Sequence, residues 1–140
     1  MNLEKTNNKQ RQWKKLLIST LAAGIGMWVI GGLWHNLVLP NFNKSIQAHH
    51  DGLVIALIAS FILALLMAYF YQLISNENHS IYEGLKVGVL IGILWVFPHG
   101  LAMAGIHDTS IMYEIKNTVY HMFEQGVGGI LISLVYKYTK

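Results

Sequence analysis

The chain has 140 residues, of which 54% are hydrophobic and only 12% charged, and its mean hydropathy is +0.41. A soluble domain of this size cannot bury that much apolar surface in one core, so lipid is expected to cover part of it. The net charge of +3 comes without a basic folded face, which argues against nucleic acid as a partner, and the absence of cysteine excludes disulfides, thiolate metal sites and iron–sulfur clusters.

Four apolar stretches dominate the sequence, and each is about 20 residues long, the length with which an α-helix crosses a hydrocarbon layer roughly 30 Å thick. They cover residues 16–39, 52–74, 87–106 and 118–136. Because the connections between them are short, consecutive helices are expected to run in opposite directions. The sequence therefore predicts an all-α fold, a polytopic membrane protein whose residues 16–140 form an antiparallel bundle of four transmembrane helices.

The segment before the first apolar stretch, residues 1–15, is expected to be a mobile, basic, cytoplasmic tail. Its positive charges are Lys5, Lys9, Arg11, Lys14 and Lys15. The loops after the first and third stretches offer only Lys44 and Lys116. Because basic flanks tend to stay in the cytoplasm, both termini are expected there, in a multi-pass protein of the cell inner membrane.

Turn-forming and capping residues mark the ends of the predicted helices. Pro40 ends the first helix, and Asp51 is a candidate N-cap of the second. Ser80 followed by Glu83 fits a capping box before the third helix. The last helix is expected to begin near Asn117.

Small residues recur at helical spacing on the third predicted helix. Gly84, Gly88 and Gly92 are spaced by four residues and therefore share one face. In lipid, helix association depends on close backbone contact, which small residues permit. We interpret this stripe as a packing surface within the chain, with a homo-oligomer contact as the alternative. The second helix has fewer small residues and is expected to face lipid most broadly.

Ionisable residues collect in one half of the predicted membrane. Their depths follow from the rise of about 1.5 Å per residue along each helix, and these depths place six residues in the outward half. They are His35, His49, His50, His99, His121 and Glu124. An ionisable group in a membrane span normally faces a cavity or a partner. We therefore expect four of these side chains to converge in one cavity near the outer surface, with His49 or His50 closing its mouth. The four are His35, His99, His121 and Glu124.

Three interpretations of this cluster stay open. Histidines and a carboxylate on facing helices suit a divalent transition metal. The expected ligands are His35, His50, His99, His121 and Glu124. Two histidines could instead hold a b-type haem. The third interpretation is a set of hydrogen-bonded helix contacts, or a proton-accessible cavity, without any cofactor.

Three further motifs combine glycine with aromatic residues. They are Gly31-Gly32-Leu33-Trp34-His35, the glycine-rich run from Gly84 to Trp95, and Asn117-x-x-Tyr120-His121 followed by Gly128. In these motifs the chain resembles a bacterial four-helix membrane family known only as a domain of unknown function. The resemblance implies a four-helix membrane fold. The chain departs from the family pattern at His35, where tyrosine is more usual, and at Pro98-His99.

Enzyme signatures are absent from the sequence, which has no Gly-x-Ser-x-Gly elbow, phosphate loop or nucleotide fingerprint. The first functional hypothesis is a bacterial inner-membrane protein whose outward His/Glu cluster binds a metal ion or handles protons. The alternative is a structural or assembly subunit that packs against a larger membrane complex. The expected partners are the lipid bilayer and either a second copy of the chain or such a complex.

Overall fold

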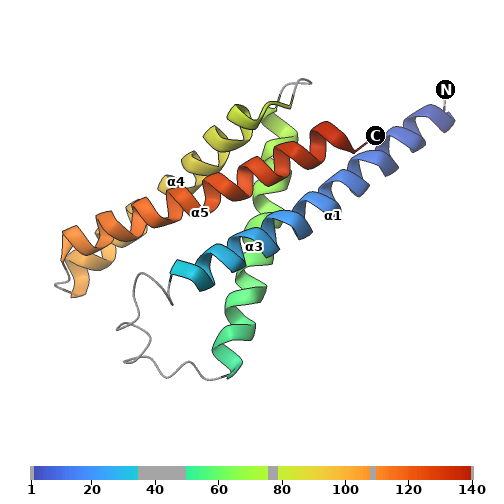
Figure 1. Cartoon of the computed structure of the whole chain (residues 1–140). Coiled ribbons are helices and arrows are strands. Elements are labelled where there is room, and N and C mark those ends of the chain that lie inside the picture. Colours follow the sequence, from blue (N-terminus) through green and yellow to red (C-terminus); the bar gives the residue numbers. More distant parts are fainter. Residues whose placement is uncertain (1, 35–49, 76–78, 108–109, 140) are drawn as a thin grey trace.

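The computed structural model describes residues 2–34, 50–75, 79–107 and 110–139, and Figure 1 shows their arrangement. This part of the chain forms four helices, which are α1 (Asn2–Leu33), α3 (His50–Ile74), α4 (Ile81–His107) and α5 (Ile111–Tyr138). The prediction of an all-α chain with four helices is therefore confirmed for the described residues.

The first helix, α1, extends further toward the N-terminus than the apolar stretch that predicted it. It begins at Asn2 and therefore includes the basic segment for which we expected a mobile tail. Residues 2–15 contain neither glycine nor proline and are rich in Lys, Gln and Arg, which favour helix. This segment is helical for that reason. The predicted turn at Pro40, together with His35 and His49, lies outside the described residues.

The predicted Ser80 cap at the start of α4 is confirmed. The backbone N–H of Glu83 donates to Oγ of Ser80 at 3.1 Å. This bond satisfies one of the N–H groups that the first turn of a helix leaves without a partner. The helix then continues through Pro98 to His107, so His99 lies within it.

The start of α5 was predicted wrongly. The helix begins at Ile111 and not near Asn117. Residues 111–117 include Glu114 and Lys116, which lower the hydropathy, but no glycine or proline that would stop a helix. The hydropathy pattern therefore identified the apolar part of α5 and missed its polar first turns.

Three of the described helices, α1, α3 and α4, are long and apolar enough to cross a membrane. The fourth, α5, is not among them, because side chains such as His121, Glu124 and Gln125 interrupt its apolar surface. It nevertheless packs against α1, α3 and α4. A helix with neighbours on several sides can carry polar groups, because those neighbours cover them.

The helices α4 and α5 pack antiparallel with their backbones almost in contact. A Cβ atom added at Gly88 would collide with the backbone carbonyl of Gln125. Cβ atoms at Gly84 and Gly92 would likewise meet backbone carbonyl oxygens of α5. The predicted glycine stripe is therefore confirmed as a helix interface within the chain.

The contact between α1 and α3 is made by side chains. The Phe61 ring of α3 lies over Gly24 of α1, where a Cβ atom would be 2.7 Å from the ring. The buried core around this contact contains Ala23, Met27, Ala64, Met67, Ala68, Tyr71, Ile132 and Tyr136. The opposite face of α3 is apolar and exposed at Ile55, Ile58 and Ile62, as expected of a surface that lipid would cover.

Both chain termini lie at one end of the molecule, which we call the termini end (Figure 1). Here Nζ of Lys15 donates to the carbonyl oxygen of Tyr136 at 3.0 Å. The hydroxyl of Tyr136 in turn donates to Oε1 of Gln72 at 3.3 Å. His121 lies on the same helix as Tyr136 but about 22 Å away along its axis, so the two ends of α5 carry separate polar groups.

Gly88→Ala is expected to destabilise the protein, because the added methyl group has to push α4 away from the α5 backbone. We expect a loss of about 1–3 kcal/mol, which is typical of overpacking a tight interior, measured by thermal unfolding in detergent. The matched control is Gly105→Ala on the same helix, where a Cβ atom meets no described atom within 4 Å. Equal melting temperatures for the two variants would contradict the close contact between α4 and α5.

Candidate functional site

His121 and Glu124 form a hydrogen-bonded ionisable pair on α5. Their spacing of three residues places both side chains on one face of the helix. Nδ1–H of His121 donates to Oε2 of Glu124 at 2.8 Å. The His121 side chain is 27% exposed and that of Glu124 only 12% exposed. Two of the predicted site residues are thus brought together in a largely covered place.

Tyr120, the residue before His121 on α5, also contacts the Glu124 carboxylate. The hydroxyl of Tyr120 hydrogen-bonds to the side chain of Glu124. The first helix closes over this contact at Gly31, where a Cβ atom would lie 3.2 Å from Tyr120 Oη and 3.3 Å from Glu124 Oε1. Trp34 stacks on the Tyr120 ring with centroids 4.8 Å apart. The end of α1 therefore covers the Tyr120–Glu124 contact.

His121 lines a first cavity, which we call the inner cavity. It has a volume of about 190 Å³, and its walls come from all four helices. Besides His121, its polar lining consists of Ser60, Glu124 and Gln125. A cavity of this kind accepts water once it offers about 10–15 Å³ and several polar partners, so the inner cavity has room for several water molecules.

His121 also lines a second cavity, which we call the side cavity. It has a volume of about 540 Å³ and lies between α4 and α5. Its polar lining includes His99, Glu114 and Asn117 together with His121. The imidazole of His121 therefore stands between two cavities, and it is the only one of the predicted site residues, among those the structure describes, that lines both.

Gln125 is a fully buried residue that contributes to the lining of the inner cavity. In the part of the chain that the structure describes, neither its Nε2 nor its Oε1 has a hydrogen-bond partner. Leaving a buried polar group without a partner costs about 1–3 kcal/mol. A water molecule or a polar ligand that reached either atom would remove that cost.

Glu114 is a buried carboxylate that the sequence analysis missed. Its Oε2 lies 2.6 Å from the place where a Cβ atom of Gly100 would be, so the glycine makes room for it. Glu114 precedes His121 by about two helical turns and so shares its face of α5. That spacing could have identified it, but we expected the helix to begin only near Asn117.

The other predicted site residues are not joined to the His121–Glu124 pair in the described part of the chain. His99 is exposed on α4 and lines the side cavity with His121. His35 and the side chain of His50 lie outside the described residues. Within residues 2–34, 50–75, 79–107 and 110–139, no three His, Asp or Glu side chains form a group that could hold a metal ion.

No protein-family model, curated protein or solved structure matches this chain. The resemblance to the bacterial four-helix family therefore stays a prediction. Function has to be inferred from the chain's own geometry, which is a His-Glu-Tyr group between two cavities, with a buried amide beside it.

Gly31→Val is expected to disturb the contact between Tyr120 and Glu124, because the new side chain meets both polar groups at van der Waals distance or closer. We expect a loss of about 1–3 kcal/mol in unfolding free energy, measured by titration with sodium dodecyl sulfate. Gly32→Val is the matched control, since a Cβ atom at Gly32 meets no described atom within 4 Å. If both variants unfold at the same detergent fraction, α1 does not close over this site.

Proposed function

We propose that the chain is a multi-pass protein of the bacterial inner membrane in which all four helices cross the bilayer and both termini lie in the cytoplasm. Three helices have the necessary length and hydropathy, and α5 has neighbours that cover its polar side chains. The basic residues before the apolar part of α1 favour a cytoplasmic N-terminus. The shared position of both termini at one end of the molecule agrees with this topology (Figure 1).

Within this membrane domain, the His121–Glu124 pair passes protons between the side cavity and the inner cavity. The observation that carries this proposal is that His121 lines both cavities while its Nδ1 is bonded to Glu124. An imidazole can take up a proton at one ring nitrogen and release one from the other. A proton that reaches Nε2 from the side cavity is thereby exchanged for the Nδ1 proton, which passes to Oε2 of Glu124.

The surroundings of Glu124 suit a group that gains and loses a proton. Tyr120 can donate a hydrogen bond to the ionised carboxylate and accept one from the neutral carboxyl group. Water in the inner cavity would carry the proton onward. In this proposal, the pair and the water that the two cavities admit form the part of the proton path that lies in the outward half of the bundle.

Proton transfer is favoured over metal binding because only two side chains of His, Asp or Glu, those of His121 and Glu124, are in contact in the described part of the site. Two ionisable side chains are enough to exchange a proton, whereas a zinc-like ion needs at least three protein ligands. The metal hypothesis therefore depends on His35 or His50, whose side chains lie outside the described residues. The b-type haem with two axial histidines would need a second histidine opposite His121.

We also propose that the proton continues from the inner cavity to the cytoplasmic side. Vesicles containing the purified protein are therefore expected to lose an imposed pH gradient faster than empty vesicles. His121→Ala and Glu124→Gln should each slow this loss by at least about tenfold, because each removes one of the two groups that exchange the proton. The fluorescence of pyranine trapped inside the vesicles measures the rate.

The matched control for that experiment is His107→Ala. His107 is exposed at the end of α4, and it lines neither cavity. If the His121→Ala and His107→Ala vesicles behave alike, the pair is only a helix contact, and a structural or assembly subunit becomes the better account. Zinc that copurifies with the protein and is lost from His121→Ala would instead identify a metal site.

The proposed topology is tested by single cysteines, because the natural chain has none. Thr139→Cys, at the termini end, should resist a membrane-impermeant maleimide in intact spheroplasts, since that end faces the cytoplasm. Ser110→Cys, in the connection between α4 and α5, should react. Permeabilised cells control for accessibility, because both variants should then react. Labelling of Thr139→Cys but not Ser110→Cys in intact spheroplasts would reverse the orientation.

A further inference from the structure

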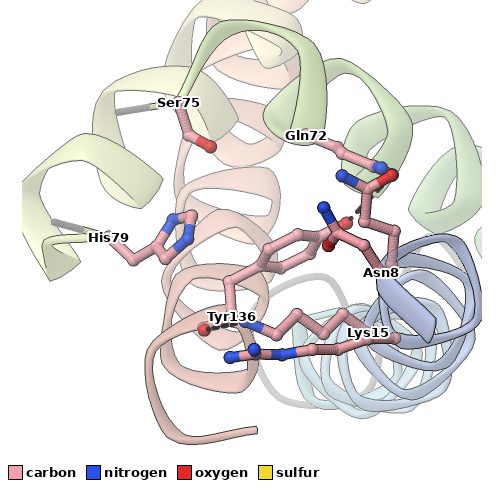
Figure 2. Close-up of a pocket in the computed structure, with 8 residues that line it drawn as sticks. Asn8, Lys15, Gln72, Ser75, His79 and Tyr136 are labelled. Atoms are coloured by element: carbon pink, nitrogen blue, oxygen red, sulfur yellow. Dashed lines mark hydrogen bonds between the residues drawn. The ribbon is translucent and has the colours of Figure 1, made fainter. Parts of the chain in front are cut away.

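A polar pocket lies at the termini end, where α1, α3 and α5 meet (Figure 2). It has a volume of about 210 Å³, and its lining includes Arg11, Lys15 and His79. Its other lining residues are Asn8, Gln12, Gln72, Ser75 and Tyr136. The described residues that line it include two cations and no carboxylate. We call it the termini pocket, and the proton path proposed above makes no use of it.

Lys15 is held in position on the wall of this pocket. Its Nζ donates to the carbonyl oxygen of Tyr136 at 3.0 Å, as Figure 2 shows. This oxygen belongs to the last turn of α5, whose carbonyl groups lack partners within the helix. An ammonium group has three N–H donors, so Lys15 keeps two for a ligand while the third fixes its place.

Arg11 brings a second positive charge to the same face of α1. It lies four residues before Lys15, a spacing at which like charges on a helix repel each other, and its charge acts unfavourably on the Lys15 ammonium. An anion placed between them would relieve this repulsion. A phosphate group can also accept two parallel hydrogen bonds from the guanidinium, which is the geometry that Arg provides best.

His79 forms the opposite wall and is fixed there by aromatic contacts (Figure 2). Its ring lies 5.4 Å from the Tyr136 ring between centroids, and its Nδ1 is 3.4 Å from Oη of Tyr71. Its backbone φ is 38°, in the left-handed region that residues other than glycine rarely adopt. Backbone strain of this kind persists only where the surrounding structure holds it, and it is often found at ligand sites.

A groove continues from the termini pocket between α1 and α3. It has a volume of about 180 Å³, and Gln12 and Gln72 line both spaces. Trp13 and Tyr69 contribute to its walls. These two aromatic residues are exposed, and such residues gather where a membrane meets water. A phosphate-sized pocket joined to an amphipathic groove at this level matches the chemistry of a glycerophospholipid more closely than that of a free phosphate ion.

We propose that the termini pocket binds the phosphate group of an anionic phospholipid in the cytoplasmic leaflet. Arg11 and Lys15 contact the phosphate oxygens, and the adjoining groove between α1 and α3 receives the glycerol backbone. This site would favour a phosphodiester with a net negative charge over a zwitterionic headgroup, because no carboxylate among the described lining residues is present to pair with a choline or ammonium group.

Native mass spectrometry of the full chain tests this site, with phosphatidylglycerol and phosphatidylcholine of equal chain length as the probes. The protein should retain one phosphatidylglycerol in preference to phosphatidylcholine. Arg11→Gln should weaken phosphatidylglycerol binding by about tenfold. Lys137→Gln removes the same charge from an exposed position at the same end of the molecule, and its effect should stay below about twofold.

Each alternative outcome has a definite meaning. Arg11 is exposed, so Arg11→Gln should melt like the parent protein, and that measurement separates loss of the site from loss of the fold. Equal retention of the two lipids, or equal effects of Arg11→Gln and Lys137→Gln, would overturn the phosphate site. Displacement of phosphatidylglycerol by millimolar inorganic phosphate would overturn the lipid as ligand, because free phosphate would then suffice.

Discussion

The backbone contact between α4 and α5 determines where the polar side chains of this protein lie. Gly88 and Gly92 bring α4 against the carbonyl groups of α5, and α5 is thereby held where α1 and α3 also reach it. Because neighbours cover much of α5, the helix can carry His121 and Glu124 although its hydropathy is too low to mark it as a membrane span. The close packing of α5 is therefore what allows the fold to contain ionisable groups away from water.

The elements that could be predicted from the sequence are those with strong local signals. The apolar length of α3 and the Ser80 cap of α4 each depend on neighbouring residues, and the structure has both close to where they were expected. The helical segment before Leu16 and the polar first turns of α5 were not predicted. Hydropathy measures affinity for lipid, and charged residues with good helix propensity can continue a helix without any such affinity.

In the candidate site, too, contacts between residues close in the sequence could be predicted, whereas contacts between different helices could not. The pairing of His121 with Glu124 followed from their spacing on one helix. The burial of Glu114 and the cover over Tyr120 depend on glycines in other helices, Gly100 and Gly31, which leave space opposite them. Which glycine lies opposite which side chain of another helix depends on how the two helices are aligned along their axes. That alignment cannot be read from the sequence of either helix alone.

Two kinds of contact hold the four helices together, and they differ in how easily they move. At the α4–α5 glycines the two backbones are in direct contact, and no side chain lies between them that could change rotamer. These two helices therefore form a rigid frame. The contact of α1 with α3 uses side chains such as Phe61, which can change rotamer and let helices shear by small amounts. Rocking of α1 and α3 against the frame would change the volume of the inner cavity first, because that cavity takes its walls from all four helices.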